Sequence, residues 1–192
     1  SNDNLQIIIA ASDEGLVWVS PGGKIIKHHY AGHCQTVTAA NLIPERQGLE
    51  IATITFWGNP GIFLIYDENG NLIKRKELIA PWGSALSPVN WSGTGQEHIL
   101  LSTHPKFGGM IDGGGDCVLE FPDDGHPFLC CEPIDLIGDK RDEIVTWDPN
   151  SIWIYTQDSL IKPDKTYNPI RQPHSNMSNY RAQLSLPRRI KK

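Results

Sequence analysis

Apolar residues come in short runs separated by polar, glycine-rich turns, and this pattern recurs along the whole chain. One unit begins at Asn41, the next at Asn90 and a third at Asp135, and a shortened unit opens the chain. Glu50, His98 and Glu143 hold the same register, 48 and 45 residues apart. A repeat of about 20–50 residues is typical of solenoids, propellers and arrays.

Each unit predicts several β-strands. A polar loop comes first, followed by an apolar run such as IATITF at 51–56, a turn, and a second run such as IFLIYD at 62–67. These runs are rich in Ile, Thr and aromatic residues and are bounded by Gly, Pro or Asn, which favours strands. Turn residues at 20–24 and 68–71 predict hairpins. No stretch longer than about ten residues has helical periodicity.

Several strands in each repeat of this length predict an all-β fold, namely a β-propeller of about four blades. The blades fall at 1–30, 31–80, 81–125 and 126–192, and the first is incomplete. A parallel β-helix is the alternative. We expect the chain to be a piece of a larger propeller or to self-associate with a second copy through the incomplete propeller. The run NYRAQLSLP at 179–187 is a candidate for the missing strand.

Composition is that of a globular chain and excludes some partners. Hydrophobic residues make up 39%, charged residues 20%, and the net charge is −5. The only basic run is PRRIKK at 187–192, so nucleic-acid binding is not expected. No apolar stretch approaches the roughly 18 residues of a membrane span, and no signal peptide is visible. Without zinc-type spacing, the cysteines are expected to be buried free thiols: Cys34, Cys117, Cys130 and Cys131.

The loop DLIGDKRDE at 135–143 resembles a short calcium loop. Asp135, Asp139 and Glu143 would supply carboxylates, and the Arg141 carbonyl would supply a neutral oxygen, because Ca²⁺ takes six to eight hard oxygen ligands. Ile137 stands where a full calcium loop carries Asp or Asn. The pattern predicts a weak Ca²⁺ site at these three carboxylates. The alternative is a metal-free turn held by side-chain hydrogen bonds.

Three residues precede the repeated loops at nearly the same spacing. His33 and Trp82 lie eight residues before Asn41 and Asn90, and His126 lies nine before Asp135. In a propeller, equivalent positions converge around the axis on one face. Aromatic rings stack on sugars and imidazoles form hydrogen bonds, so a substrate-binding role is predicted. The alternative is structural: each histidine bonds a backbone carbonyl, and the tryptophan packs.

Three segments carry a resemblance to a known family. The segments 32–53 (GHCQTVTAANLIPERQGLEIAT), 135–157 (DLIGDKRDEIVTWDPNSIWIYTQ) and 179–187 resemble stretches of the rhamnogalacturonan lyases of polysaccharide lyase family 11. The resemblance implies the C-terminal portion of an eight-bladed, FG-GAP-like propeller, secreted or periplasmic. Such an enzyme cleaves the rhamnogalacturonan-I backbone of pectin by β-elimination, with calcium in its cleft.

The resemblance also bears on site residues. In the family, a His and an Asp of one motif contact the cleft calcium; His33 matches the His, but Gln35 replaces the Asp. A neutral Gln is a poorer calcium ligand, so Gln35 is assigned to substrate binding. β-Elimination needs a neutralised carboxylate and a base. His104 and Lys106 are weak candidates for the base, and surface loop residues are the alternative.

Three functions remain open from the sequence. The chain is expected to belong to a lyase-like protein that cleaves or binds an acidic plant polysaccharide of the rhamnogalacturonan type. It could equally be a noncatalytic carbohydrate-binding propeller that lost the metal. A third alternative is a protein-interaction propeller of the FG-GAP kind.

Overall fold

The computed structural model describes residues 6–78, 86–128, 130–159, 166–171 and 185–186. All regular structure in these ranges is β-strand, and no helix occurs in them, so the all-β prediction is confirmed. It follows that the described ranges hold no helix long and apolar enough to cross a membrane.

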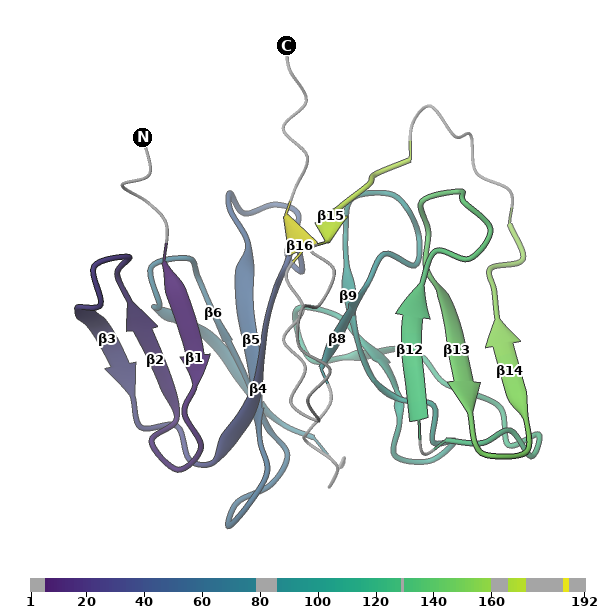
Figure 1. Cartoon of the computed structure of the whole chain (residues 1–192), viewed down its shortest axis with the longest axis horizontal. Helices are drawn as coiled ribbons and strands as arrows, with labels where there is room; N and C mark the ends of the chain where they lie inside the picture. The colour runs from purple at the N-terminus through teal and green to yellow at the C-terminus, as the bar shows by residue number, and fades with distance from the viewer. Residues whose placement is uncertain (1–5, 79–85, 129, 160–165, 172–184, 187–192) are drawn as a thin grey trace.

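The strands form successive antiparallel sheets in which each strand pairs with the next along the chain (Figure 1). The first sheet has three strands, as expected for an incomplete unit: β1 (Ile7–Ala10), β2 (Leu16–Val19) and β3 (Ile25–His29). The second has four: β4 (Cys34–Ala40), β5 (Glu50–Thr55), β6 (Ile62–Tyr66) and β7 (Leu72–Glu77).

The third sheet repeats the four-strand pattern with β8 (Ser87–Val89), β9 (His98–Ser102), β10 (Gly109–Ile111) and β11 (Cys117–Leu119). The fourth contains β12 (Cys130–Ile134), β13 (Glu143–Trp147) and β14 (Ile152–Tyr155). A two-stranded pair joins β15 (Ile170–Arg171) to β16 (Ser185–Leu186). Of the C-terminal run 179–187, only 185–186 is described, and it pairs with β15.

Burial along the strands explains why the apolar runs differ in pattern. β5 and β6 are buried at every position, because another sheet covers each face of the second sheet. β4 alternates between fully and partly buried residues, and β7 is largely exposed at the outer edge. Strands covered on both faces read as continuous apolar runs, whereas a half-covered strand alternates.

A hydrophobic core fills each of the three junctions between neighbouring sheets. Leu16 and Trp18 pack between the first and second sheets, Ile54 and Phe63 between the second and third, and Ile144 between the third and fourth. The first strands of successive sheets lie next to one another: β1 by β4, β4 by β8, and β8 by β12. The sheets therefore stack in sequence order (Figure 1).

The connecting segments lie at the two ends of the stack (Figure 1). The loops 41–49, 90–97 and 135–142 lie at the upper end. The turns that join β1 to β2, β5 to β6, β9 to β10 and β13 to β14 lie at the lower end. Residues far apart in the sequence are thereby gathered into an upper and a lower surface.

The upper loops are tied together by a hydrogen-bond pattern that occurs twice. The Asn41 amide donates to Oε2 of Glu97 (3.0 Å), the Glu97 amide donates to the Asn41 carbonyl (2.8 Å), and Asn41 Nδ2 donates to the Gly95 carbonyl. Asn90 makes the same three bonds with Asp142 and Lys140 at the next junction. We call this arrangement the loop clasp.

Candidate functional site

His33 and Gln35, both predicted to bind substrate, lie together at the lower end. Nδ1 of His33 donates to Oδ1 of Asp13 at 2.5 Å, and Nε2 accepts from Nε2 of Gln35 at 3.0 Å. These partners define the neutral tautomer that carries its proton on Nδ1. Asp13 belongs to the turn between β1 and β2, so the cluster joins the first sheet to the start of β4.

Beside this cluster, the turn between β5 and β6 presents Trp57 to solvent. The Phe56 amide donates to the His33 carbonyl at 2.9 Å, and the Phe56 and Trp57 rings meet edge-on at 4.7 Å between centroids. Trp57 nevertheless remains 62% exposed. Gly58 and Gly61 have φ values of 75° and 86°, which residues with a Cβ rarely adopt. The turn thus holds an exposed indole one residue from Phe56, whose backbone amide bonds His33.

A second aromatic group occupies the lower end of the third sheet. His104 contacts Phe107 and Phe128 at 5.0 and 4.4 Å between ring centroids, and Lys106 Nζ lies 5.1 Å from the Phe107 ring. Nδ1 of His104 accepts hydrogen bonds from the amides of Lys106 and Phe107. The neutral ring therefore carries its proton on Nε2 and has no free lone pair to remove a proton. The catalytic role of His104 and Lys106 stays a prediction that this geometry does not favour.

His126 also lies toward the lower end, but its side chain is 0% exposed. Nδ1 lies 2.6 Å from Oδ1 of Asp124, and Nε2 lies 2.6 Å from the Thr103 carbonyl oxygen. The ring packs against Phe121 and Tyr155. Hydrogen bonding to His126 holds the pKa of the Asp124 carboxyl below its usual range. Burial, chiefly, raises the pKa of Tyr155 to about 12.

The geometry of His126 fits the structural alternative, in which the histidine bonds a backbone carbonyl. The side chain is also completely enclosed, so a ligand could reach the ring only after the packing around it opens. Its substrate-binding role stays a prediction. Trp82, the third member of the predicted set, lies outside the described residues.

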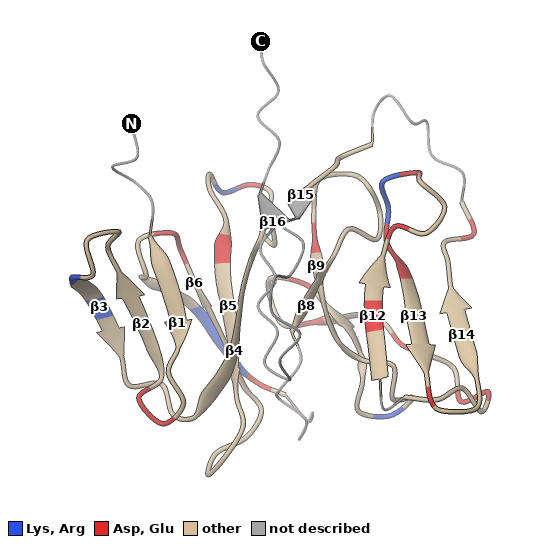
Figure 2. Ribbon diagram, in the orientation of Figure 1, with Lys and Arg blue, Asp and Glu red and all other residues tan. Residues whose placement is uncertain are grey.

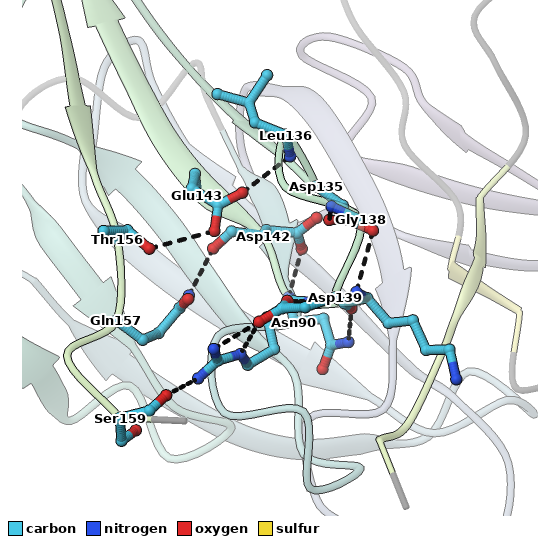
Figure 3. Close-up of polar contacts among 12 residues, drawn as sticks. Asn90, Asp135, Leu136, Gly138, Asp139, Asp142, Glu143, Thr156, Gln157 and Ser159 are labelled. Carbon is cyan, nitrogen blue, oxygen red and sulfur yellow. Dashed lines mark hydrogen bonds and ion pairs between the residues drawn. The ribbon is translucent and has the colours of Figure 1, made fainter. Parts of the chain in front are cut away.

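The three predicted calcium ligands lie at the upper end and are engaged in hydrogen bonds (Figure 3). Asp135 accepts from the amides of Gly138 and Lys140. Glu143 accepts from the Leu136 amide at 2.8 Å and from the Thr156 hydroxyl at 3.3 Å. This is the arrangement of a turn held by its own side chains.

Asp139 makes the strongest case against a bound cation. Its Oδ2 accepts from Nε and Nη2 of Arg141 at 2.9 and 2.5 Å, and the Arg141 hydrogen bond lowers the pKa of the Asp139 carboxyl. Arg141 is itself buried, so its guanidinium already supplies the positive charge that Ca²⁺ would bring. Across the described ranges, no three His, Cys, Asp or Glu residues gather in a metal-binding group. The loop carboxylates bond amides and an arginine in this arrangement, and calcium binding stays a prediction.

The predicted metal and substrate residues occupy opposite ends of the sheets. Strands of about five residues separate them, and a strand rises about 3.3 Å per residue, so the separation is on the order of 15 Å. A cation that neutralises a uronate must touch the same sugar that the base deprotonates. The structure therefore does not bring the two predicted sites into one lyase centre.

A shallow cleft of about 290 Å³ lies between the second and third sheets. Lys74 and Glu45 from one side and Gln96 and Asp112 from the other contribute polar groups to its lining. Gly113 is required there, because an added Cβ would lie 2.7 Å from the Leu42 carbonyl oxygen. None of the sequence-predicted site residues lines this cleft.

Sequence reasoning missed three accessible residues of the lower surface. Asp13 bonds His33, Phe128 contacts His104, and Trp57 is exposed in the neighbouring turn. An available signal was the turn FWGNPG at 56–61, where a large aromatic residue stands in a glycine- and proline-containing turn. Such a turn cannot bury its side chains in the sheet core.

No family model matches this chain, and no curated protein or solved structure matches it either. The functional proposal therefore depends on the site geometry and on the sequence resemblance.

Proposed function

We propose that the chain is part of a β-propeller of the rhamnogalacturonan lyase type that binds an acidic plant polysaccharide without cleaving it. The propeller proposal is supported by sequential antiparallel sheets whose first strands neighbour one another. In a propeller, successive four-stranded sheets surround an axis in this manner. The binding surface is the lower end of the sheets.

The observation that carries the binding proposal is the exposure of Trp57, in the turn whose Phe56 amide bonds the His33 carbonyl. Burying a large aromatic ring is favourable, so a ring that is 62% exposed in an ordered turn is available for contact with a partner. Sugar rings present C–H groups that stack on indole faces, and their hydroxyls bond with imidazole, amide and carboxylate groups. His33, Gln35 and Asp13 place such groups at the same end of the sheets, and the His33 carbonyl bonds the turn that carries Trp57.

Binding without cleavage is favoured by the chemistry of the two predicted centres. His104 lacks a free lone pair in its neutral form, and Asp139 is paired with Arg141. His104 therefore offers no base in its neutral form, and Asp139 offers no cation site at the lower surface. Lys106 and the Nε2–H donor of His104 remain suited to contact uronate groups.

The test is a calorimetric titration of the purified chain with rhamnogalacturonan I. Trp57→Ala should weaken binding about tenfold or more, because a central aromatic anchor contributes at least 1.4 kcal/mol or so. Trp57→Phe is the matched control, since it keeps an aromatic face and should retain most of the affinity. Both variants should melt within a few degrees of the unmodified chain, because exposed substitutions change stability by about 0.5 kcal/mol or less.

Two results would oppose the proposal. Release of unsaturated uronides, detected by their ultraviolet absorbance, would show that the chain cleaves the polymer. If Trp57→Ala and the unmodified chain bound rhamnogalacturonan I with equal affinity, the lower surface would not be the binding site.

A further inference from the structure

Two sheet faces in the described ranges carry rows of exposed apolar side chains. Ile134, Ile152 and Ile154 project from the fourth sheet, and Ile7, Ile9 and Ile25 from the first. β1, β2 and β14 contain no charged residue, as Figure 2 shows. Exposed apolar rows on neighbouring strands usually mark a surface that a partner covers.

The second sheet shows what covers such a face inside the stack. Phe63 and Ile65 of β6 stand opposite Ile54 and Ala52 of β5. All four belong to the core that packs against the third sheet, and Phe63 and Ile65 are each 1% exposed. We call the face of a sheet that points to the next sheet in sequence its forward face.

The fourth sheet has the same forward face without its cover. Ile152 and Ile154 of β14 stand opposite Trp147 and Val145 of β13, in the register that β6 and β5 use. They are 72% and 56% exposed, although they hold the places of Phe63 and Ile65. By analogy with the second sheet, this surface is therefore suited to pack against one more β-sheet.

The first sheet has the opposite face exposed. Ile8 and Ala10 of β1 pack toward the second sheet. Ile7 and Ile9 alternate with them and so point away from it. Ile7 stands opposite Val19 of β2, which pairs on its other side with Ile25 of β3. These residues form the backward face of the first sheet.

Each of the three junctions in the stack joins a forward face to a backward face. In the described ranges, the fourth sheet leaves a forward face exposed and the first sheet leaves a backward face exposed. The two surfaces are of the kinds that pack against each other. Two forward faces, in contrast, do not meet at any of the three junctions.

We propose that the forward face of the fourth sheet docks on the backward face of the first sheet of a second copy. Two copies related by a two-fold axis make this contact twice, so the assembly closes as a dimer instead of growing into a filament. Four sheets from each copy give eight, which is within the range of about four to eight blades found in closed propellers. The contact involves neither the turns of the lower end nor a ligand. Dimerisation can therefore be tested separately from polysaccharide binding.

The test is sedimentation equilibrium of the chain and of one variant at each face. Ile152→Lys places a charge on the forward face and Ile7→Lys places one on the backward face. The unmodified chain should be a dimer. Each variant alone should dissociate with a dissociation constant raised about 30-fold or more, the effect of losing a central apolar contact. Val118→Lys, an exposed apolar position of the third sheet, is the matched control and should remain a dimer.

Mixing the two variants gives the decisive result. The intact forward face of Ile7→Lys can still dock on the intact backward face of Ile152→Lys, so a one-to-one dimer with a single contact should form. An unmodified chain that is monomeric at high concentration would overturn the proposal. An Ile7→Lys variant that remains as dimeric as the unmodified chain would also overturn it, because the forward faces would then pair with each other. Far-UV circular dichroism should be the same for all three variants.

Discussion

Asn90 and Asp142 each donate a backbone hydrogen bond to the other, across the junction of the third and fourth sheets. The Asn90 amide donates to Oδ2 of Asp142 at 2.6 Å, and the Asp142 amide donates to the Asn90 carbonyl at 3.0 Å. Both residues are buried. Because Asn41 and Glu97 are joined in the same way one sheet earlier, the loop clasp is a repeated element that sets how adjacent sheets meet.

Removing an acid of the loop clasp should destabilise the fold. Asp142→Ala leaves the buried Asn90 amide without its acceptor, which costs about 1–3 kcal/mol. Urea unfolding measures this loss directly. Asp123→Ala, at an exposed position, is the control and should change the free energy of unfolding by about 0.5 kcal/mol or less. Equal stability of the two variants would mean that the clasp does not hold the sheets together.

Glu50 should make stability depend on pH. Burial raises the pKa of its carboxyl above the ordinary value of 4.5, and the amides of Ile43 and Leu42 lower it in part. The folded state then binds more protons than the unfolded state between the ordinary and the raised pKa. The contribution of Glu50 to stability therefore falls as pH rises through that window.

Glu50→Gln tests this dependence, since glutamine keeps an oxygen that can accept both amides but cannot ionise. The free energy of unfolding of the variant, relative to the unmodified chain, should increase as pH rises through the window. Asp139, whose pKa is lowered by its hydrogen bonds with Arg141, has the opposite effect: its stabilisation is lost as pH falls through the lowered pKa. Asp139 is present in both proteins, so its contribution cancels in the difference between their free energies of unfolding. A difference independent of pH would contradict the prediction.

His126 and His33 should respond differently to truncation. His126→Ala removes a buried ring with two hydrogen bonds, so stability should fall by about 1–3 kcal/mol while polysaccharide affinity is unchanged. His33→Ala should weaken binding, because the ring orders Asp13 and Gln35 at the lower end of the sheets. Thermal melts and titration calorimetry separate the two effects. Loss of affinity without loss of stability in His126→Ala would restore it to the binding site.

Calcium should have no effect on thermal stability. A ligand that binds only the folded state at about 100 times its dissociation constant adds about 2.7 kcal/mol. Because Arg141 occupies Asp139, we expect equal melting temperatures with excess calcium and with a chelator. A melting temperature that falls on chelation, and no longer does so in Asp139→Ala, would show that calcium displaces the arginine.

Much of the fold could be predicted from the chain. Glu50, His98 and Glu143 were aligned by the repeat, and they begin β5, β9 and β13. The strand positions could be predicted because side-chain alternation and turn residues are local properties of the sequence. Each unit of the repeat shows them independently of the others. A closed propeller depends on how the units are arranged around an axis, which no local pattern encodes, and it remains part of the proposed function.

For the site, the sequence identifies candidate residues but not the groups that each one contacts in the fold. Asp135, Asp139 and Glu143 have the spacing of calcium ligands, yet each carboxylate accepts hydrogen bonds from residues of its own unit. Glu97 was overlooked because it lies one residue before the aligned position. Its role is visible only where it meets Asn41, 56 residues away in the chain.

The sequence by itself determined the strands, the turns and the order of the sheets, because these follow from the short-range alternation of apolar and polar residues. Tertiary structure decided which of two chemically similar residues is accessible. The His33 side chain is 12% exposed, whereas His126 is enclosed by Phe121 and Tyr155, although the two lie eight and nine residues before a repeated loop. Burial depends on what the neighbouring sheet places against a residue, and that neighbour is contributed by a distant part of the chain.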